Sequence, residues 1–522
     1  MNAMWTGLLA ALLMFSCQDA GNQTQEPAAQ NTAVSETSEA SAPTTTPAPA
    51  ITSGTIKPPA GWPKYEGTDW KFNPNRANPV ACNFSVKVTG ADASKVQLIG
   101  VYGEQNYPAG DAQVQADGTA VFSKQGGYLS GFYYVLFKDN TAIPLVLNKD
   151  QEFSITIGNK ADISGTAKVE GSIDNELYHE MARYEKQIAP ELNALGAQQQ
   201  GKKPSEQVWK DARVKQMKLI NGKMAKLRKM RKDHPDAFFP VFKLAGQNPN
   251  PNPPLLATGD IDNAMYGAMY RNAFWSDVDF GDVRLLRSPV LHNKLKRYIT
   301  ELTPQSIDSV IKSIDVVSQR SLGDPEVYKH VINWIGTEYK ESKIMGGQAI
   351  FLHIVDNYFT DELAYWDKPA NLEKLRDKVE ETRYSLIGMQ GQNVTTNDIN
   401  GVQRSLYDLK GEILVVFMYS PNCEHCREAA PELLEIYNKW HDKGLDIYGI
   451  CTETELEPLK KFVEKYKFPW WNVMDPTYKS YYMKYHVDIT PEIYVLDKDR
   501  KIIAKDLKPF QLEEVLEREL GN

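Results

Sequence analysis

Two cysteines separated by two residues, Cys423 and Cys426, are the side chains in this sequence best suited to chemistry. A Cys-x-x-Cys pair can close a disulfide and exchange it with another, and the thiolate is the attacking species. The residues between them, Glu424 and His425, influence how readily Cys423 ionises. His425 favours the Cys423 thiolate and Glu424 opposes it. The sequence therefore predicts thiol-disulfide exchange, with a reduction potential that these opposing neighbours leave open.

The segments on either side of the pair must position it. Residues 411–419 form a continuous apolar run, which is typical of a buried parallel strand, and residues 424–440 carry an amphipathic helical pattern. Cys423 should therefore stand where a strand ends and a helix begins, and the exposed N–H groups there favour its thiolate. Cys426, one helical turn further on, faces inward, so it can resolve a mixed disulfide formed at Cys423.

This order of strand, Cys-x-x-Cys and helix resembles the thioredoxin superfamily, specifically its membrane-anchored TlpA/ResA-like branch. Pro431 matches the proline that kinks the active-site helix, and Thr490-Pro491 matches a cis-proline loop that aligns the substrate backbone. Residues 446–451, 492–496 and 501–505 are predicted to be strands, and the second of them directly follows the Thr490-Pro491 loop. Residues 511–520 are predicted to form the last helix. The resemblance implies an α/β thioredoxin-like fold over residues 391–522. It also implies protein disulfide or thiol substrates and no cofactor or metal.

Two acidic groups of related proteins are missing. Thioredoxin has a buried acid in the strand before the site, where this chain has Phe417. Related reducing lipoproteins often carry Glu three residues after the second cysteine, where this chain has Ala429, and Glu428 is the adjacent substitute. Without a well-placed acid, proton transfer at Cys426 would be slower or mediated by solvent.

The N-terminus reads as a targeting segment. Residues 5–15 form an apolar run of signal-peptide length that ends at Ser16-Cys17, which resembles a bacterial lipobox. We predict a signal peptide over residues 1–17, lipidation of Cys17 and a disordered tether over residues 18–57. The alternative is an ordinary cleaved signal with an incidental cysteine. Either interpretation places the chain in the bacterial cell envelope, facing the periplasm.

Two further domains are predicted between the tether and the thioredoxin-like domain. Short apolar runs separated by Gly and Asp turns predict an antiparallel β-sandwich-like domain of unknown function over residues 58–175. The stretch 169–178 resembles the closing motif of a β-rich domain that often precedes thioredoxin-like domains. Helical periodicity then predicts an α-helical domain over residues 176–390. The fold class is therefore multidomain.

Other candidate sites have simpler interpretations. Three histidines lack zinc-ligand spacing and are predicted to be structural or surface residues: His292, His330 and His353. The basic run 215–232 is predicted to be the solvated face of a helix, with an anion-binding or membrane-surface patch as the alternative. The net charge of -8 argues against a nucleic-acid partner. Cys451 is interpreted as a buried thiol, with a third redox cysteine as the alternative, and Cys82 as unpaired.

Three functional hypotheses follow. The first is an envelope thiol-disulfide oxidoreductase that receives electrons from a membrane donor; the TlpA/ResA resemblance favours reduction. The second is a partner-binding or redox-sensing scaffold, because three quarters of the chain lies outside the thioredoxin-like domain that carries the thiol pair. The third and least favoured is a thiol peroxidase, which the Ser420-x-x-Cys423 spacing allows but the paired Cys426 and Thr490-Pro491 oppose.

Overall fold

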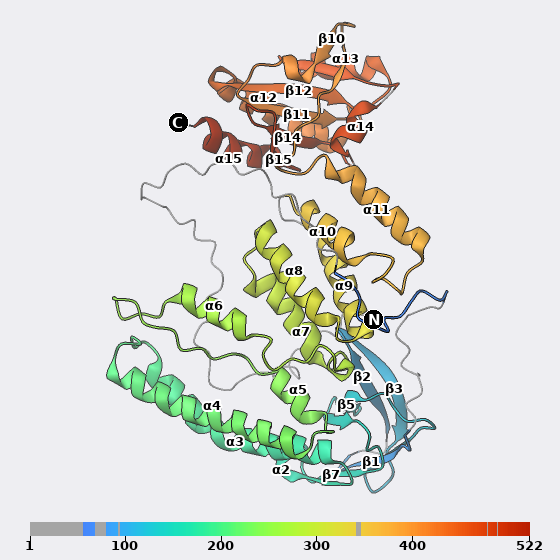
Figure 1. The fold of residues 1–522 in the computed structure, drawn as a ribbon, viewed down its shortest axis with the longest axis vertical. Coiled ribbons are helices and arrows are strands. Elements are labelled where there is room, and N and C mark those ends of the chain that lie inside the picture. Colours follow the sequence, from blue (N-terminus) through green and yellow to red (C-terminus); the bar gives the residue numbers. More distant parts are fainter. Residues whose placement is uncertain are drawn as a thin grey trace. The chain divides into compact units, whose positions relative to one another are not determined.

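The computed structural model describes residues 56–67, 80–91, 94–340, 346–477, 479–487 and 489–521 (Figure 1). They fall into two compact units. The first takes in the described residues of 69–304 and 315–331, and the second takes in those of 37–68, 305–314 and 332–522. The predicted signal peptide with Cys17, and the tether up to residue 55, lie outside the described residues.

The division between the units differs from the predicted domain bounds. It passes through two helices, α8 (Ile307–Ser321) and α9 (Pro325–Lys340), so the helices predicted as one domain over 176–390 are divided between the units. Helical periodicity locates helices but carries no information on which neighbours they pack against.

The first unit begins with two four-stranded sheets of order β4-β1-β7-β8 and β3-β2-β5-β6. Side chains from both sheets share one apolar core that includes Phe84, Phe122 and Phe153. The strands are β1 (Asn83–Val88), β2 (Lys95–Tyr102), β3 (Gln105–Gln113), β4 (Thr119–Ser123), β5 (Gly131–Leu136), β6 (Ala142–Leu147), β7 (Ser154–Ile157) and β8 (Ala167–Glu170).

The sandwich is not purely antiparallel, which corrects the predicted arrangement. β1 and β7 pair in parallel, with Val86 opposite Ile155. After β4 pairs antiparallel with β1, the chain crosses to the other sheet for β5 and β6 and then returns as β7 on the other side of β1. Such a crossover can add a strand in the same direction as the first.

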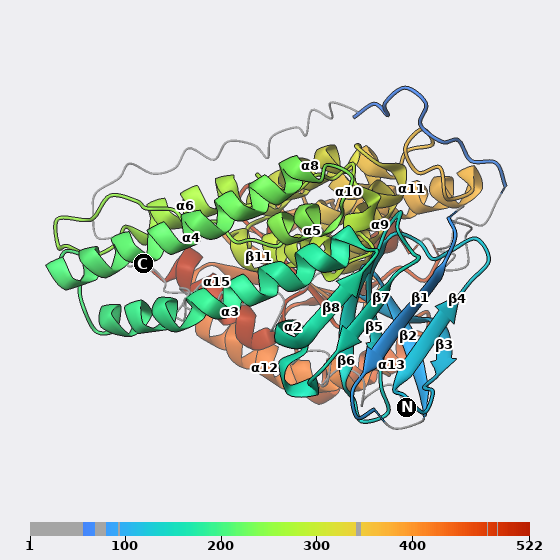
Figure 2. The ribbon, with the colours of Figure 1, turned by 90° about the horizontal axis from the view of Figure 1, so that it is seen from below.

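Most of the helices in the first unit follow the sandwich. The long pair α3 and α4 lies side by side (Figure 2), and the basic run belongs to α4, where Lys226 pairs with Glu180 and Arg228 with Asp277. The helical segments are η1 (Lys160–Asp162), α2 (Ile163–Thr166), α3 (Ile173–Gln199), α4 (Gln207–Asp233), α5 (Phe239–Ala245), α6 (Asn263–Ala273), η2 (Val283–Leu285), α7 (Pro289–Arg297) and the π-helical η3 (Tyr298–Leu302).

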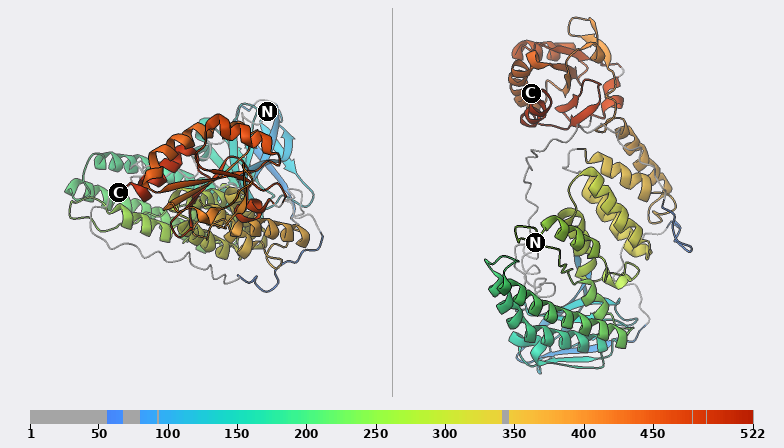
Figure 3. Two further views of the ribbon diagram at one scale, coloured as in Figure 1. Left: turned by 90° about the horizontal axis from the view of Figure 1, so that it is seen from above. Right: turned by 60° about the vertical axis from the view of Figure 1, so that its left-hand side comes forward.

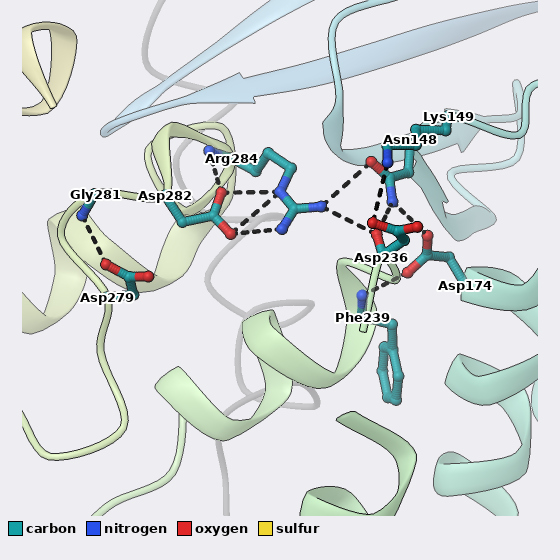
Figure 4. A network of polar contacts seen from close by, with 9 residues as sticks. All are labelled: Asn148, Lys149, Asp174, Asp236, Phe239, Asp279, Gly281, Asp282 and Arg284. Carbon is teal, nitrogen blue, oxygen red and sulfur yellow. Dashed lines mark hydrogen bonds and ion pairs between the residues drawn. The ribbon is translucent and has the colours of Figure 1, made fainter. Parts of the chain in front are cut away.

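A buried polar network fastens these helices to the sandwich (Figure 4). Asp174, near the start of α3, accepts hydrogen bonds from the Asn148 side chain and from the backbone N–H of Phe239. Arg284 reaches Asn148 Oδ1 at 3.4 Å while an ion pair holds it to Asp282. The motif noted over residues 169–178 therefore has a structural use, because it anchors α3 to the sandwich and caps α5.

The second unit holds a seven-stranded sheet of order β10-β9-β13-β12-β11-β14-β15. β11, β12 and β13 are parallel, while β14 and β15 run antiparallel to their neighbours. Its strands are β9 (Thr395–Asp398), β10 (Gln403–Ser405), β11 (Ile413–Tyr419), β12 (Leu445–Cys451), β13 (Trp471–Met474), β14 (Glu492–Leu496) and β15 (Ile502–Lys505). Its helical segments are α10 (Gln348–Tyr358), α11 (Pro369–Arg383), η4 (Leu406–Asp408), α12 (Glu424–Trp440), η5 (His441–Lys443), α13 (Leu456–Tyr466), α14 (Ser480–Tyr485) and α15 (Pro509–Leu520).

The position of β11 in the sheet explains why its sequence is apolar throughout. Phe417 and Tyr419 point into the core shared with α12, α13 and α15, whereas Val416 and Met418 point into the core on the opposite face, beside α14. The sheet is thus covered on both faces (Figure 3). Among the described helices, none combines the length and apolar character needed to cross a membrane.

Candidate active site

Cys423 stands at the junction that the sequence predicts. β11 ends at Tyr419, and Cys423 is the extended N-cap residue of α12, with φ -79° and ψ 128°. Its side chain is partly exposed, and its Sγ donates a hydrogen bond to the backbone carbonyl of Thr490 over 3.1 Å. A nucleophile in this position is both accessible and held at a defined angle.

The surroundings of Cys423 favour its thiolate. Burial alone raises the pKa of the Cys423 thiol, but hydrogen bonds from the Cys426 thiol and N–H, from Thr490 and from the His425 N–H outweigh it. The pKa of Cys423 is therefore lowered. This is the effect expected of N–H groups at the start of a helix.

Cys426 is the opposite kind of thiol. It is fully buried in the core beneath α12, and burial raises its pKa to about 12. A hydrogen bond from the Ser420 backbone N–H acts in the other direction. Neither thiol takes part in a disulfide in the structure.

The loop at residues 490–491 lies against the pair. The Thr490–Pro491 peptide bond is cis, as the resemblance implies, and β14 begins directly after it. The Thr490 side chain hydrogen-bonds both cysteine sulfurs. Pro431 lies inside α12, also as expected.

The two residues inside the motif face solvent. His425 Nδ1 contacts Glu428 Oε2 at 3.1 Å, and this hydrogen bond with Glu428 raises the pKa of His425. Glu424 is exposed in the first turn of α12. Glu428 is exposed as well and bonds His425, while Phe417 and Ala429 are buried. None of these residues places a carboxylate against Cys426.

Two residues at this edge of the sheet escape prediction as a pair. The Ser420 hydroxyl donates to a carboxylate oxygen of Glu453, and Ser420 Oγ accepts from the Asn422 N–H at 3.1 Å. Glu453 follows β12, and the carboxyl ends of adjacent parallel strands meet at one edge, as the ends of β11 and β12 do here. From the sequence, this rule could have placed Glu453 beside Ser420.

The remaining cysteines are buried thiols. Burial raises the pKa of Cys451 to about 12, and it also raises the pKa of Cys82. Cys451 lies in the same core as Cys426. Its predicted structural role is consistent with this placement.

The structure brings two of the three candidate histidines together. His292 Nδ1 and His330 Nε2 lie 3.1 Å apart in the first unit, whereas His353 contacts Asn357 in the second. Burial lowers the pKa of His330 to about 3. No cluster of three or more His, Cys, Asp or Glu side chains that could hold a metal ion occurs in the described part of the chain.

Comparisons with known proteins concern the C-terminal domain. Residues 387–505 match the AhpC/TSA family. The thiol-disulfide oxidoreductase ResA of Bacillus cereus is 30% identical over 120 residues, which cover 23% of this chain and 68% of that protein. ResA of Bacillus thuringiensis is 29% identical over 136 residues, covering 26% of this chain and 76% of that protein.

A solved thioredoxin domain of a thiol-disulfide oxidoreductase from Bacteroides vulgatus is 32% identical and covers 26% of this chain and 97% of its own, with a TM-score of 0.25. Through its C-terminal domain, this chain belongs to the thiol-disulfide oxidoreductases of the thioredoxin-like family.

Proposed function

We propose that this protein reduces disulfides of other proteins in the bacterial envelope, with Cys423 as the attacking thiol and Cys426 as the resolving thiol. The single observation that carries the proposal is the difference between the two thiols. Cys423 is partly exposed with a lowered pKa, whereas Cys426 is buried with a pKa of about 12. Only Cys423 combines access to a substrate with a ready thiolate.

The reaction proceeds in two exchanges. The Cys423 thiolate attacks one sulfur of a substrate disulfide, forms a mixed disulfide and releases the other substrate sulfur as a thiolate. Cys426 loses its proton to solvent and attacks the Cys423 sulfur, and the second substrate thiolate leaves. The substrate gains two electrons, and the Cys423–Cys426 disulfide must then be reduced by a membrane donor.

Thr490 and Pro491 have the role of aligning the substrate. Thr490 already contacts both sulfurs, and its carbonyl receives the Cys423 thiol hydrogen bond in the absence of substrate. An extended substrate segment beside this loop would bring its disulfide to Cys423. The predicted lipid on Cys17 would hold the domain at a membrane surface, where a membrane donor can reach it.

Trapping experiments test the two roles. Cys426→Ser should accumulate a mixed disulfide between Cys423 and its protein substrates, visible by non-reducing electrophoresis of envelope fractions. Cys423→Ser should trap nothing, and Cys451→Ser should behave as the unmodified chain. Trapping by Cys423→Ser, or none by Cys426→Ser, contradicts the assigned roles.

A further inference from the structure

In the second exchange Cys426 must react as a thiolate, and the cysteine pair alone does not explain how that thiolate forms. Cys426 is fully buried and its pKa is raised to about 12, so little thiolate is present near neutral pH. Resolution depends on whatever stabilises that thiolate as it forms. The Ser420 backbone N–H hydrogen-bonds the Cys426 sulfur and acts to lower its pKa. The direction of that N–H depends on the conformation of the turn that joins β11 to α12.

Ser420 is held in place from outside the turn. It is 8% exposed, its hydroxyl donates to Glu453, and its Oγ accepts from the Asn422 N–H at 3.1 Å. The Ser420 side chain thus bonds both to Asn422 within the turn and to the carboxylate of Glu453, which follows β12. A rotation of Ser420 would break both bonds.

Glu453 reaches Ser420 because of the sheet register. Tyr419 pairs with Cys451, and the Thr452 N–H donates to the Tyr419 carbonyl at 2.9 Å. The chain beyond β12 therefore runs beside the turn. Glu428, the other acid considered for this role, is turned outward and bonds His425 at 3.1 Å.

We propose that Glu453 is a positioning residue for Cys426. By accepting the Ser420 hydroxyl bond, it fixes the turn so that the Ser420 N–H stabilises the Cys426 thiolate during resolution. This inference rests on the proposed function. In the resolving step the Cys426 proton goes to solvent, the Cys426–Cys423 bond forms, the bond from Cys423 to the leaving sulfur breaks, and that sulfur departs with the electron pair.

The test uses the purified full chain and one equivalent of dithiobis(nitrobenzoate), a small aromatic disulfide that releases a coloured thiolate. The first release reports attack by Cys423 and the second reports resolution by Cys426; Cys426→Ser should show only the first. Glu453→Ala should slow the second release about tenfold, as expected when one hydrogen bond to an ionised group is lost, and leave the first within about twofold. Glu453→Gln, whose amide oxygen can still accept from Ser420, should restore most of the rate.

Further variants separate the possible outcomes. Ser420→Ala should slow the second release as Glu453→Ala does, and it tests the inference if Glu453→Ala fails to fold. Glu455→Ala, an exposed neighbour, should change neither release. An unchanged second release in Glu453→Ala or Ser420→Ala overturns the inference, as does a Glu453→Gln rate no better than that of Glu453→Ala. A missing first release in the unmodified chain overturns the proposed function instead.

Discussion

The lowered pKa of Cys423 depends partly on its partner. The Cys426 thiol is the largest of the contributions that lower it, because it donates a hydrogen bond to the Cys423 sulfur. The backbone N–H groups of residues 425 and 426 remain when the partner's side chain is removed. The reactivity of Cys423 is therefore a property of the pair and of the helix start together.

This leads to the first prediction. Cys426→Ala should raise the pKa of Cys423, so alkylation of Cys423 by iodoacetamide should reach its half-maximal rate at a higher pH than in the unmodified chain. Mass spectrometry of the Cys423 peptide measures the rate, and Cys451→Ala serves as the control. A midpoint that stays or falls in Cys426→Ala would show that the Cys426 thiol does not lower the pKa of Cys423.

Glu492 is a second residue with an unusual environment. It follows Pro491 in β14 and points away from α12, and burial together with nearby Asp506 raises its pKa to about 9. Its Oε2 makes no hydrogen bond among the described residues. Lys505, itself almost fully buried, acts in the opposite direction. At neutral pH the folded protein therefore keeps this carboxyl protonated.

The sign of the stability effect follows from that shift. In the unfolded chain the pKa of Glu492 is near its ordinary value of 4.5, so between pH 4.5 and about 9 the folded state binds more protons. Stability is complete at low pH and is lost as pH rises, by at most about 1.4 kcal/mol for each pH unit. As the pH rises from 5.5 to 8.5, the melting temperature of Glu492→Gln should therefore increase relative to that of the unmodified chain.

The control is Glu457→Gln, which changes an exposed carboxylate. Its melting temperature should follow that of the unmodified chain across the same range. Parallel curves for Glu492→Gln and the unmodified chain would mean that Glu492 is ionised in the folded protein.

At the scale of elements, the start of α3 depends on Asn175. This fully buried side chain accepts from the Val146 N–H and donates to the Val146 carbonyl, both at 2.9 Å. Asn175 therefore substitutes for a neighbouring strand at β6. Ser172 caps the helix three residues earlier, so helix and sheet are joined within one turn.

Asn175→Ala should consequently destabilise the first unit by about 2–4 kcal/mol, because two buried backbone groups lose their partners. Urea unfolding followed by near-ultraviolet circular dichroism measures the change. Glu176→Ala, one residue away and exposed, should stay within about 0.5 kcal/mol. A small effect of Asn175→Ala would mean that water replaces the lost bonds.

The elements also show what a sequence can and cannot predict. β11 and α12 are predicted almost to the residue, because a doubly buried strand and a helix with one apolar face leave strong patterns. β3 and β8 escape prediction because few of their side chains are buried, and α5 is too short to show a period. The Cys-x-x-Cys motif locates the site, whereas the contact of Ser420 with Glu453 depends on strand register.

At the scale of the whole molecule, the family match and the chemistry occupy the same quarter of the chain. The described remainder includes a sandwich and helices whose polar contacts, such as those of Asp174 and Asn175, serve packing. The direction of electron flow depends on the reduction potential of the Cys423–Cys426 pair in the full chain.

The final prediction concerns that direction. A strong oxidant owes its potential to a highly stabilised thiolate in the reduced form. Here burial opposes ionisation of Cys423, and His425 is held 3.1 Å from Glu428, which offsets its positive charge. Both features act against stabilisation of the thiolate, so we expect the pair to favour the disulfide. Equilibration of the full chain in redox buffers should give a potential near thioredoxin's, about -270 mV, rather than near about -120 mV as in a strong oxidant. A value near the latter would mean that the protein makes disulfides in its partners, and it would leave the roles of Cys423 and Cys426 in exchange unchanged.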